Sequence, residues 1–129
     1  MRIEEAEGYI ALGMFQDAWL ALDEIPTDRQ LSSAVLRCRA LCLMGFEAWS
    51  RGEAVALILG EGDEDDRRMA AAFFHEGAVW HAEHTGLALA RHWASQAIRV
   101  RPEQRLAILG DLRFPEGFTL RPELAQLAG

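Results

Sequence analysis

Four histidines within one short stretch are the residues of this sequence best suited to chemistry. The stretch contains His75, His81, His84 and His92, with Glu76 and Glu83 beside them. His81 and His84 are three residues apart, so on a helix both imidazoles would reach one metal ion. The His-Glu-x-x-His spacing of zinc peptidases is absent, because Val79 stands where the second histidine would be. We therefore expect packed or solvent-facing histidines, with His81 as a buried filler, and a metal-dependent enzyme using His75, His81 and His84 as an alternative.

An acidic segment, Asp63-Glu64-Asp65-Asp66, suggests calcium, because calcium loops begin with closely spaced carboxylates. The segment lacks the glycine and the distal glutamate of an EF-hand, and two arginines follow it at once. Carboxylates in a first helical turn face the positive end of the helix dipole, and arginines after them can pair at helical spacing. The sequence therefore predicts a solvated helix start here rather than a metal site.

The other chemical signals are weak. Cys38 and Cys42 are four residues apart, which is not the spacing of a redox or zinc motif, so we expect reduced thiols in or near the core. A nucleophile elbow, a phosphate-binding glycine loop and a dinucleotide fingerprint are all absent from the sequence. We therefore expect no catalytic residue, no bound metal and no cofactor.

Composition narrows the class of protein. The chain has 129 residues, of which 50% are hydrophobic and 26% are charged, as expected for a single soluble domain with its own core. All 13 basic residues are arginine, and they face 20 acidic residues, for a net charge of −7. This charge argues against nucleic acid or an anionic membrane as the main partner. The acidic N-terminus is unlike a signal peptide, and we expect a cytoplasmic protein.

Helical segments must position these residues. Alanine and leucine dominate between breaks at glycine and proline, and no stretch has the alternation of a β-strand. The breaks predict helices over residues 2–12, 15–25, 29–45, 47–59, 64–84 and 87–101, which form three pairs.

The three pairs repeat at a nearly constant step. A step of 34 residues carries Phe15 onto Trp49, and a step of 38 carries Trp49 onto Leu87. The same steps align two sets of small residues, which are Ala6, Ala40 and Ala78, and Ala18, Gly52 and Ala90. Two helices approach closely only where the facing side chains are small, so each pair is predicted to be a tight antiparallel hairpin.

This pattern resembles the tetratricopeptide repeat family. The segment from Gly13 to Ala18 is similar to the family's turn, and Ala90, Ala94, Ala97 and Pro102 stand at its second-helix spacing. The resemblance implies an all-α fold, a right-handed α-solenoid of three helical hairpins with a C-terminal capping helix. It implies repeats at about residues 1–28, 29–62 and 63–102, and a capping tail at 103–129. Within that tail, Pro122 suits the first turn of a short final helix.

In such a stack the first helices of successive pairs line a concave face that binds a peptide or helix of a partner protein. The periodic alignment assigns to this face Ile3, Glu7, Ile10, Arg37, Leu41, Met44, His75, Val79 and Glu83. We expect partner side chains to be buried on Leu41, Met44 and Val79, with Arg37 and Glu7 setting orientation. The chain has no lysine and no asparagine, so the carboxylate clamp of some family members is not expected. An alternative is that the chain's own C-terminal tail covers this face.

Other functions remain open at this point. Small proteins of this kind also act as secretion-type chaperones, and no motif separates that role from peptide binding. Residues 1–28 carry one arginine against seven acids, while residues 91–121 carry six arginines against three acids. This polarity favours head-to-tail contact between copies, so a self-assembling scaffold is a further alternative.

Overall fold

Helices make up most of the chain in a computed structural model that describes residues 2–118. They are α1 (Ile3–Ala11), α2 (Phe15–Asp23), the 3-10 helix η1 (Thr27–Arg29), α3 (Ser33–Gly45), α4 (Trp49–Leu59), α5 (Glu64–His84), α6 (Leu87–Val100) and α7 (Gln104–Leu109). No β-strand occurs between residues 2 and 118, so the predicted all-helical class is confirmed. Over the same residues, no helix combines the length and the apolar character needed to cross a bilayer.

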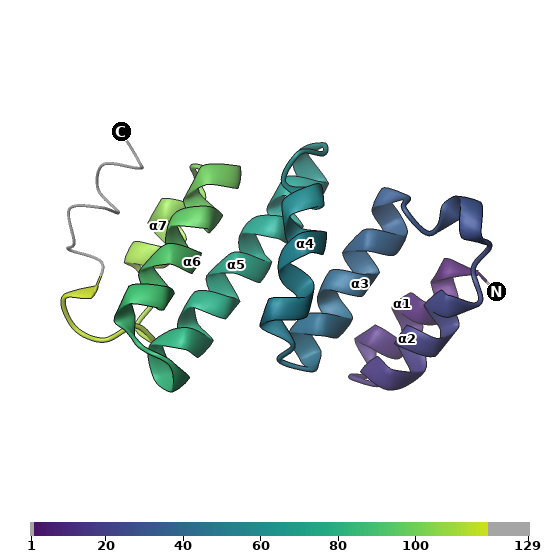
Figure 1. Cartoon of the computed structure of the whole chain (residues 1–129), viewed down its shortest axis with the longest axis horizontal. Helices are drawn as coiled ribbons and strands as arrows, with labels where there is room; N and C mark the ends of the chain where they lie inside the picture. Colours follow the sequence, from purple (N-terminus) through teal and green to yellow (C-terminus); the bar gives the residue numbers. More distant parts are fainter. Residues whose placement is uncertain (1, 119–129) are drawn as a thin grey trace. The chain divides into compact units, whose positions relative to one another are not determined.

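The chain divides into two compact units, residues 1–69 and residues 70–129, and α5 begins in the first and continues in the second. In the first unit α1 packs against α2, and α3 packs against α4 (Figure 1). Helix α3 also contacts both α1 and α2, which joins the two hairpins. One buried cluster of this unit consists of Ala6, Ala18, Ala21, Leu22, Ile25, Val35, Cys38 and Cys42.

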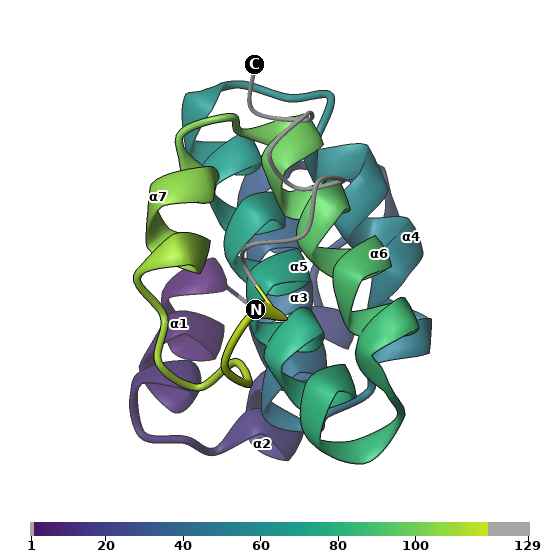
Figure 2. The same ribbon diagram turned by 90° about the vertical axis from the view of Figure 1, so that its left-hand side faces the viewer.

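In the second unit, α5 and α6 run side by side as a hairpin (Figure 1 and Figure 2). The ring of Trp93 on α6 lies 5.9 Å from Phe73, 5.6 Å from Phe74 and 5.0 Å from His81, centroid to centroid, and these three residues lie on α5. Helix α7 packs against α6. Aromatic contacts around Trp93 therefore help to hold the hairpin together.

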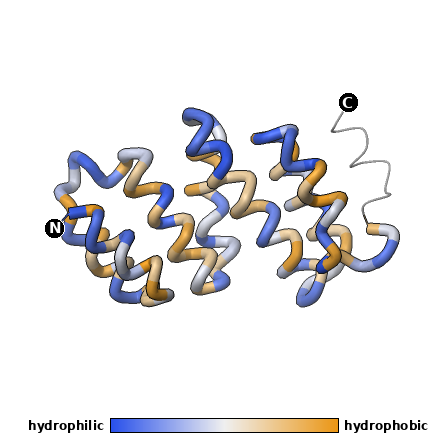
Figure 3. The backbone as a smooth tube through the Cα atoms, turned by 180° about the vertical axis from the view of Figure 1, so that it is seen from behind, coloured by the Kyte–Doolittle hydropathy of each residue, from blue (hydrophilic) through white to orange (hydrophobic). Residues whose placement is uncertain are grey.

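The small residues aligned by the repeat are buried in every hairpin. Ala6, Ala18, Ala40, Ala78 and Ala90 are 0% exposed, and Gly52 is also buried. Hydrophobic and hydrophilic residues alternate along the helices rather than gathering in one segment (Figure 3). The first four helices each bury some of their residues and expose others.

The same kind of backbone hydrogen bond occurs at each of the three hairpin turns. At each turn a backbone N–H reaches the carbonyl five residues earlier, at 2.8 Å, and the three acceptors are Tyr9, Leu43 and His81. These acceptors are related by the same steps of 34 and 38 residues as the packing positions. In the first turn Gly13 has a φ of +74°, and in the second Glu47 takes a φ of +56°, a left-handed conformation that favours glycine.

Three predicted helix boundaries were wrong by a few residues. The helix expected over residues 29–45 begins at Ser33, because residues 27–29 form η1 and the Ser32 hydroxyl accepts the N–H of Val35 at 3.4 Å. The helix expected from residue 47 begins at Trp49, because Glu47 is left-handed. The helix expected to reach residue 25 ends at Asp23, ahead of Pro26. The short helix predicted from Pro122 lies outside the described residues.

Candidate functional site

A pocket of about 340 Å³ opens between α1 and α3, beside the start of α5. It is lined by Glu7, Ile10 and Ala11 of α1, by Ala34, Arg37, Cys38 and Leu41 of α3, and by Met69 of α5. Six of these eight side chains are apolar or carry sulfur, and the other two are charged. Such a pocket suits an apolar group held in place by a few polar contacts.

Helical spacing brings the lining residues together. Arg37 and Leu41 are four residues apart on α3, and Glu7 and Ala11 are four apart on α1, so each pair lies on one face of its helix. Four predicted partner-facing residues, Glu7, Ile10, Arg37 and Leu41, therefore meet in one pocket. Met44 is half-buried on α3 and does not line this pocket.

A buried carboxylate lies beside the pocket. Asp66, with a side chain only 6% exposed, accepts hydrogen bonds from the Ser33 hydroxyl at 2.7 Å and from the Arg37 guanidinium. Burial alone would raise the pKa of Asp66, but the hydrogen bonds and the charge of Arg37 outweigh it and hold that pKa below its ordinary value of 3.8. The start of α5 is thus tied to α3, and the positive charge of Arg37 is already paired.

This finding corrects one part of the sequence analysis. The acidic segment does start a helix, since the Asp63 carboxylate accepts the backbone N–H of Asp66 at 2.9 Å and Glu64 pairs with Arg67 at 2.9 Å. It is not wholly solvated, because Asp66 points inward to α3. The hydroxyl at Ser33 and the guanidinium at Arg37 give this carboxylate the partners that a buried charge requires.

Both cysteines are buried and unbridged, as the sequence predicts. Burial raises the pKa of Cys38 to about 11, with a further contribution from the charge of Glu7. Burial likewise raises the pKa of Cys42 to about 11. At neutral pH these groups are protonated thiols, so the sulfur in the pocket is a packing surface and not a nucleophile.

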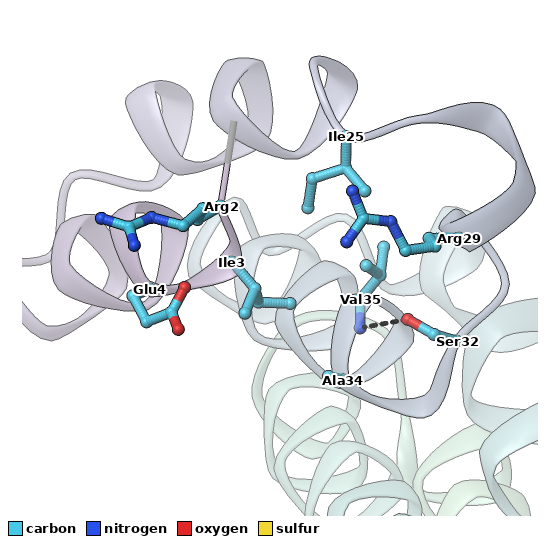
Figure 4. Close-up of a pocket in the computed structure, with 8 residues that line it drawn as sticks. All are labelled: Arg2, Ile3, Glu4, Ile25, Arg29, Ser32, Ala34 and Val35. Carbon is cyan, nitrogen blue, oxygen red and sulfur yellow. Dashed lines mark hydrogen bonds between the residues drawn. The ribbon is translucent and has the colours of Figure 1, made fainter.

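A second, smaller pocket of about 260 Å³ adjoins the first, with Ala34 shared by both. Its lining comprises Arg2, Ile3, Glu4, Ile25, Arg29, Ser32, Ala34 and Val35. Figure 4 shows Ile3, Ile25 and Val35 directed into it from three segments, with Arg29 reaching across. The two pockets lie along one seam, because the first contains the later residues of α1 and α3 and the second contains their starts.

The predicted partner-facing residues of the second unit have different surroundings. His75 is buried, with Nε2 2.8 Å from the Asp111 carboxylate and Nδ1 2.9 Å from the Gln104 side-chain amide. Val79 is 5% exposed, and Glu83 is exposed. With its proton on Nε2, the imidazole donates to Asp111 and accepts from Gln104. His75 is therefore covered by the chain's own tail, which is the alternative that the sequence left open.

An arginine completes this attachment of the tail. Arg113 forms a two-pronged ion pair with Glu76, at 2.8 and 2.9 Å, and also contacts Asp111 at 2.8 Å. The hydrogen bond from Arg113 is the main cause that holds the pKa of Asp111 well below its ordinary value. The ring of Phe114 stacks on His75 at 5.9 Å. These contacts fasten the segment after α7 to α5 within the second unit.

The other histidines also have separate partners. His81 is buried, and its Nδ1 lies 3.0 Å from the Thr85 hydroxyl. His84 is exposed, with Nδ1 2.9 Å from the Trp80 carbonyl and its ring stacked on the Trp80 indole. No set of three histidine, cysteine, aspartate or glutamate residues within 2–118 is arranged to hold a metal ion. The geometry gives the metal-dependent alternative no support.

Comparisons with known proteins found no relative of this chain. No protein-family model, no curated protein and no solved structure matches this chain.

Sequence reasoning missed several residues of the main pocket. Ala34 and Cys38 follow from helical spacing, because they stand three residues before Arg37 and Leu41 respectively. Met69 carried no local signal, because it reaches the pocket only through the path of the chain from α4 into α5.

Proposed function

We propose that this chain is a tetratricopeptide-like α-solenoid of three hairpins. The same turn hydrogen bond at Tyr9, Leu43 and His81 supports this, as do the buried small residues at matching steps. The contacts of α3 with both α1 and α2 also suit a stack in which each hairpin packs on the previous one.

Its proposed function is non-enzymatic: the protein binds a peptide or helix of a partner protein along the seam between α1 and α3. The observation that carries this proposal is the pocket of about 340 Å³, which brings Glu7, Ile10, Arg37 and Leu41 together over an apolar floor. Burial of one apolar partner side chain in such a pocket supplies affinity, and polar groups at the rim orient the segment.

Arg37 supports the site indirectly in this proposal. Its guanidinium pairs with buried Asp66, so it shapes one wall of the pocket. Arg37→Glu would place two carboxylates together and disturb the fold, because like charges repel strongly when one is buried. A binding test therefore needs a different variant.

Ala11→Trp provides that variant. Ala11 is exposed at the end of α1 and lines the pocket, so an indole there blocks the space without replacing a core residue. Peptides are selected from a displayed library on the wild-type protein, and their affinities for both proteins are compared. We expect Ala11→Trp to weaken binding by more than about tenfold, as loss of a central anchor does.

Ala54→Trp is the matched control, since Ala54 is an exposed alanine on α4 that lines neither pocket. It should leave the affinity unchanged. Selected peptides that bind both variants equally well, or a library that yields no binder at all, would contradict the proposal.

A second candidate, self-association, is favoured by a separate observation. Leu106 on α7 is 72% exposed and Leu112 after it is 96% exposed, and both lie in the arginine-rich part of the chain. Such apolar groups with a basic surround could meet the acidic N-terminal part of another copy. Analytical ultracentrifugation tests this: mass should rise with protein concentration and fall with salt, and a constant monomer mass would exclude it.

A further inference from the structure

The two charged residues of the main pocket differ in whether an ion pair neutralises their charge. Arg37 is paired with Asp66, whose buried carboxylate neutralises it. Glu7 is exposed and forms no ion pair within residues 2–118. The net charge that the pocket offers to a ligand is therefore the negative charge of Glu7.

Cys38 lines the pocket together with both charged residues. Burial raises the pKa of its thiol, and the charge of Glu7 raises it further, while the charges of Arg37 and Arg39 lower it. Because Arg37 is paired with Asp66 and Glu7 is exposed, the pocket favours a positive charge next to the apolar group that fills it.

The surroundings reinforce this preference. Residues 1–28, which contain all of α1, carry seven acids and one arginine, and the whole chain has a net charge of −7. An acidic field of this kind attracts basic segments over distances near the Debye length. The neighbouring pocket has the opposite character, since Arg2 and Arg29 line it with Glu4.

We infer that the pocket between α1 and α3 takes one bulky apolar side chain flanked by a cationic group, so that the partner segment is a basic amphipathic one. This inference rests on the proposed function and specifies its partner. The volume of about 340 Å³ is near the lower end of ligand pockets, about 300–1,000 Å³, and fits a single large side chain. Glu7 then pairs with an arginine or lysine of the partner.

Two small probes of equal length test this inference. Tryptamine and indole-3-propionate carry the same indole on the same two-carbon chain, and they end in an ammonium and a carboxylate respectively. Titrations are followed by NMR through the methyl signals of Ile10, Leu41 and Met69, which belong to this pocket and not to its neighbour. We expect tryptamine to bind about fivefold to tenfold more tightly, from attraction of one probe and repulsion of the other near a single exposed charge.

Glu7→Gln should remove the difference between the two probes, because it keeps the side-chain shape and deletes the charge. Glu5→Gln is the matched control, since Glu5 is an exposed carboxylate on the same helix that lines neither pocket. It should preserve most of the difference.

Equal affinities, a preference for the carboxylate, or a difference that persists in Glu7→Gln would overturn the charge preference and leave the pocket as a binding site. If neither probe moves these methyl signals, the inference that the pocket takes a single anchor is refuted. The proposed function is then still judged separately, by the peptide selection and the Ala11→Trp variant.

Discussion

Replacing Asp66 with alanine should lower the free energy of unfolding by more than replacing an exposed carboxylate would. Asp66 is 6% exposed and accepts hydrogen bonds from Ser33 and from the charged Arg37. A hydrogen bond that involves a charged group contributes about 1.5–3 kcal/mol. The Arg37 side chain is 31% exposed, so solvent screening reduces its share. We expect a loss of about 2–4 kcal/mol in the free energy of unfolding.

Urea denaturation followed by circular dichroism measures this loss, and the melting temperature should fall by roughly 10 °C. Asp65→Ala is the matched control, because Asp65 lies in the same first turn of α5 but is exposed. Both variants lose the favourable interaction with the helix dipole, so the difference between them isolates the buried contacts. If the two variants lose the same stability, the reasoning about Asp66 is refuted.

The same carboxylate predicts a pH dependence. Its pKa in the folded protein lies below the ordinary value of 3.8, so the unfolded state binds the proton more readily. The stabilisation is therefore complete above about pH 5 and disappears as the pH falls through the folded-state pKa. The stability difference between wild type and Asp66→Asn should shrink over that acidic range. A difference that stays constant down to the lowest pH at which the protein folds would contradict this assignment.

Three other outcomes are expected from local geometry. Gly45→Ala should destabilise the first unit by more than about 1 kcal/mol, because its Cβ would clash with the ring of Phe15, and denaturant titration measures the loss. Glu47→Gly should instead stabilise this unit by about 1 kcal/mol, because the residue has a φ of +56°. An unchanged midpoint of denaturant unfolding would argue against backbone strain at this position. Cys38 and Cys42 should react slowly with a thiol reagent at pH 8 and rapidly after unfolding, because burial raises both pKa values to about 11. Rapid reaction of the folded protein would contradict their burial.

Much of the fold was predictable because its signals are local. Glycine and proline breaks located six helices, and the steps of 34 and 38 residues located the small residues that proved to be buried. The boundary errors also have local causes, in the Ser32 cap and in the left-handed Glu47. Capping and left-handed residues decide where a helix begins, and their effects compete with helix propensity.

The site was predictable only in part, because much of it depends on contacts distant in sequence. Helical periodicity placed Glu7 and Arg37 on one predicted face, and both line the main pocket. It did not reveal that Arg37 pairs with Asp66, which is 29 residues away. It also did not reveal that His75 binds Asp111, which is 36 residues away. A charged side chain looks the same in a sequence whether it is free or paired.

A partner segment is proposed to bind in the pocket between α1 and α3. The most direct measurement is a methyl NMR titration of the full chain with a peptide selected from the displayed library. The largest shifts are expected on the methyl groups of Ile10, Leu41 and Met69, which line this pocket. Shifts centred on Leu106 and Leu112 instead, with these three methyl groups unmoved, would contradict it.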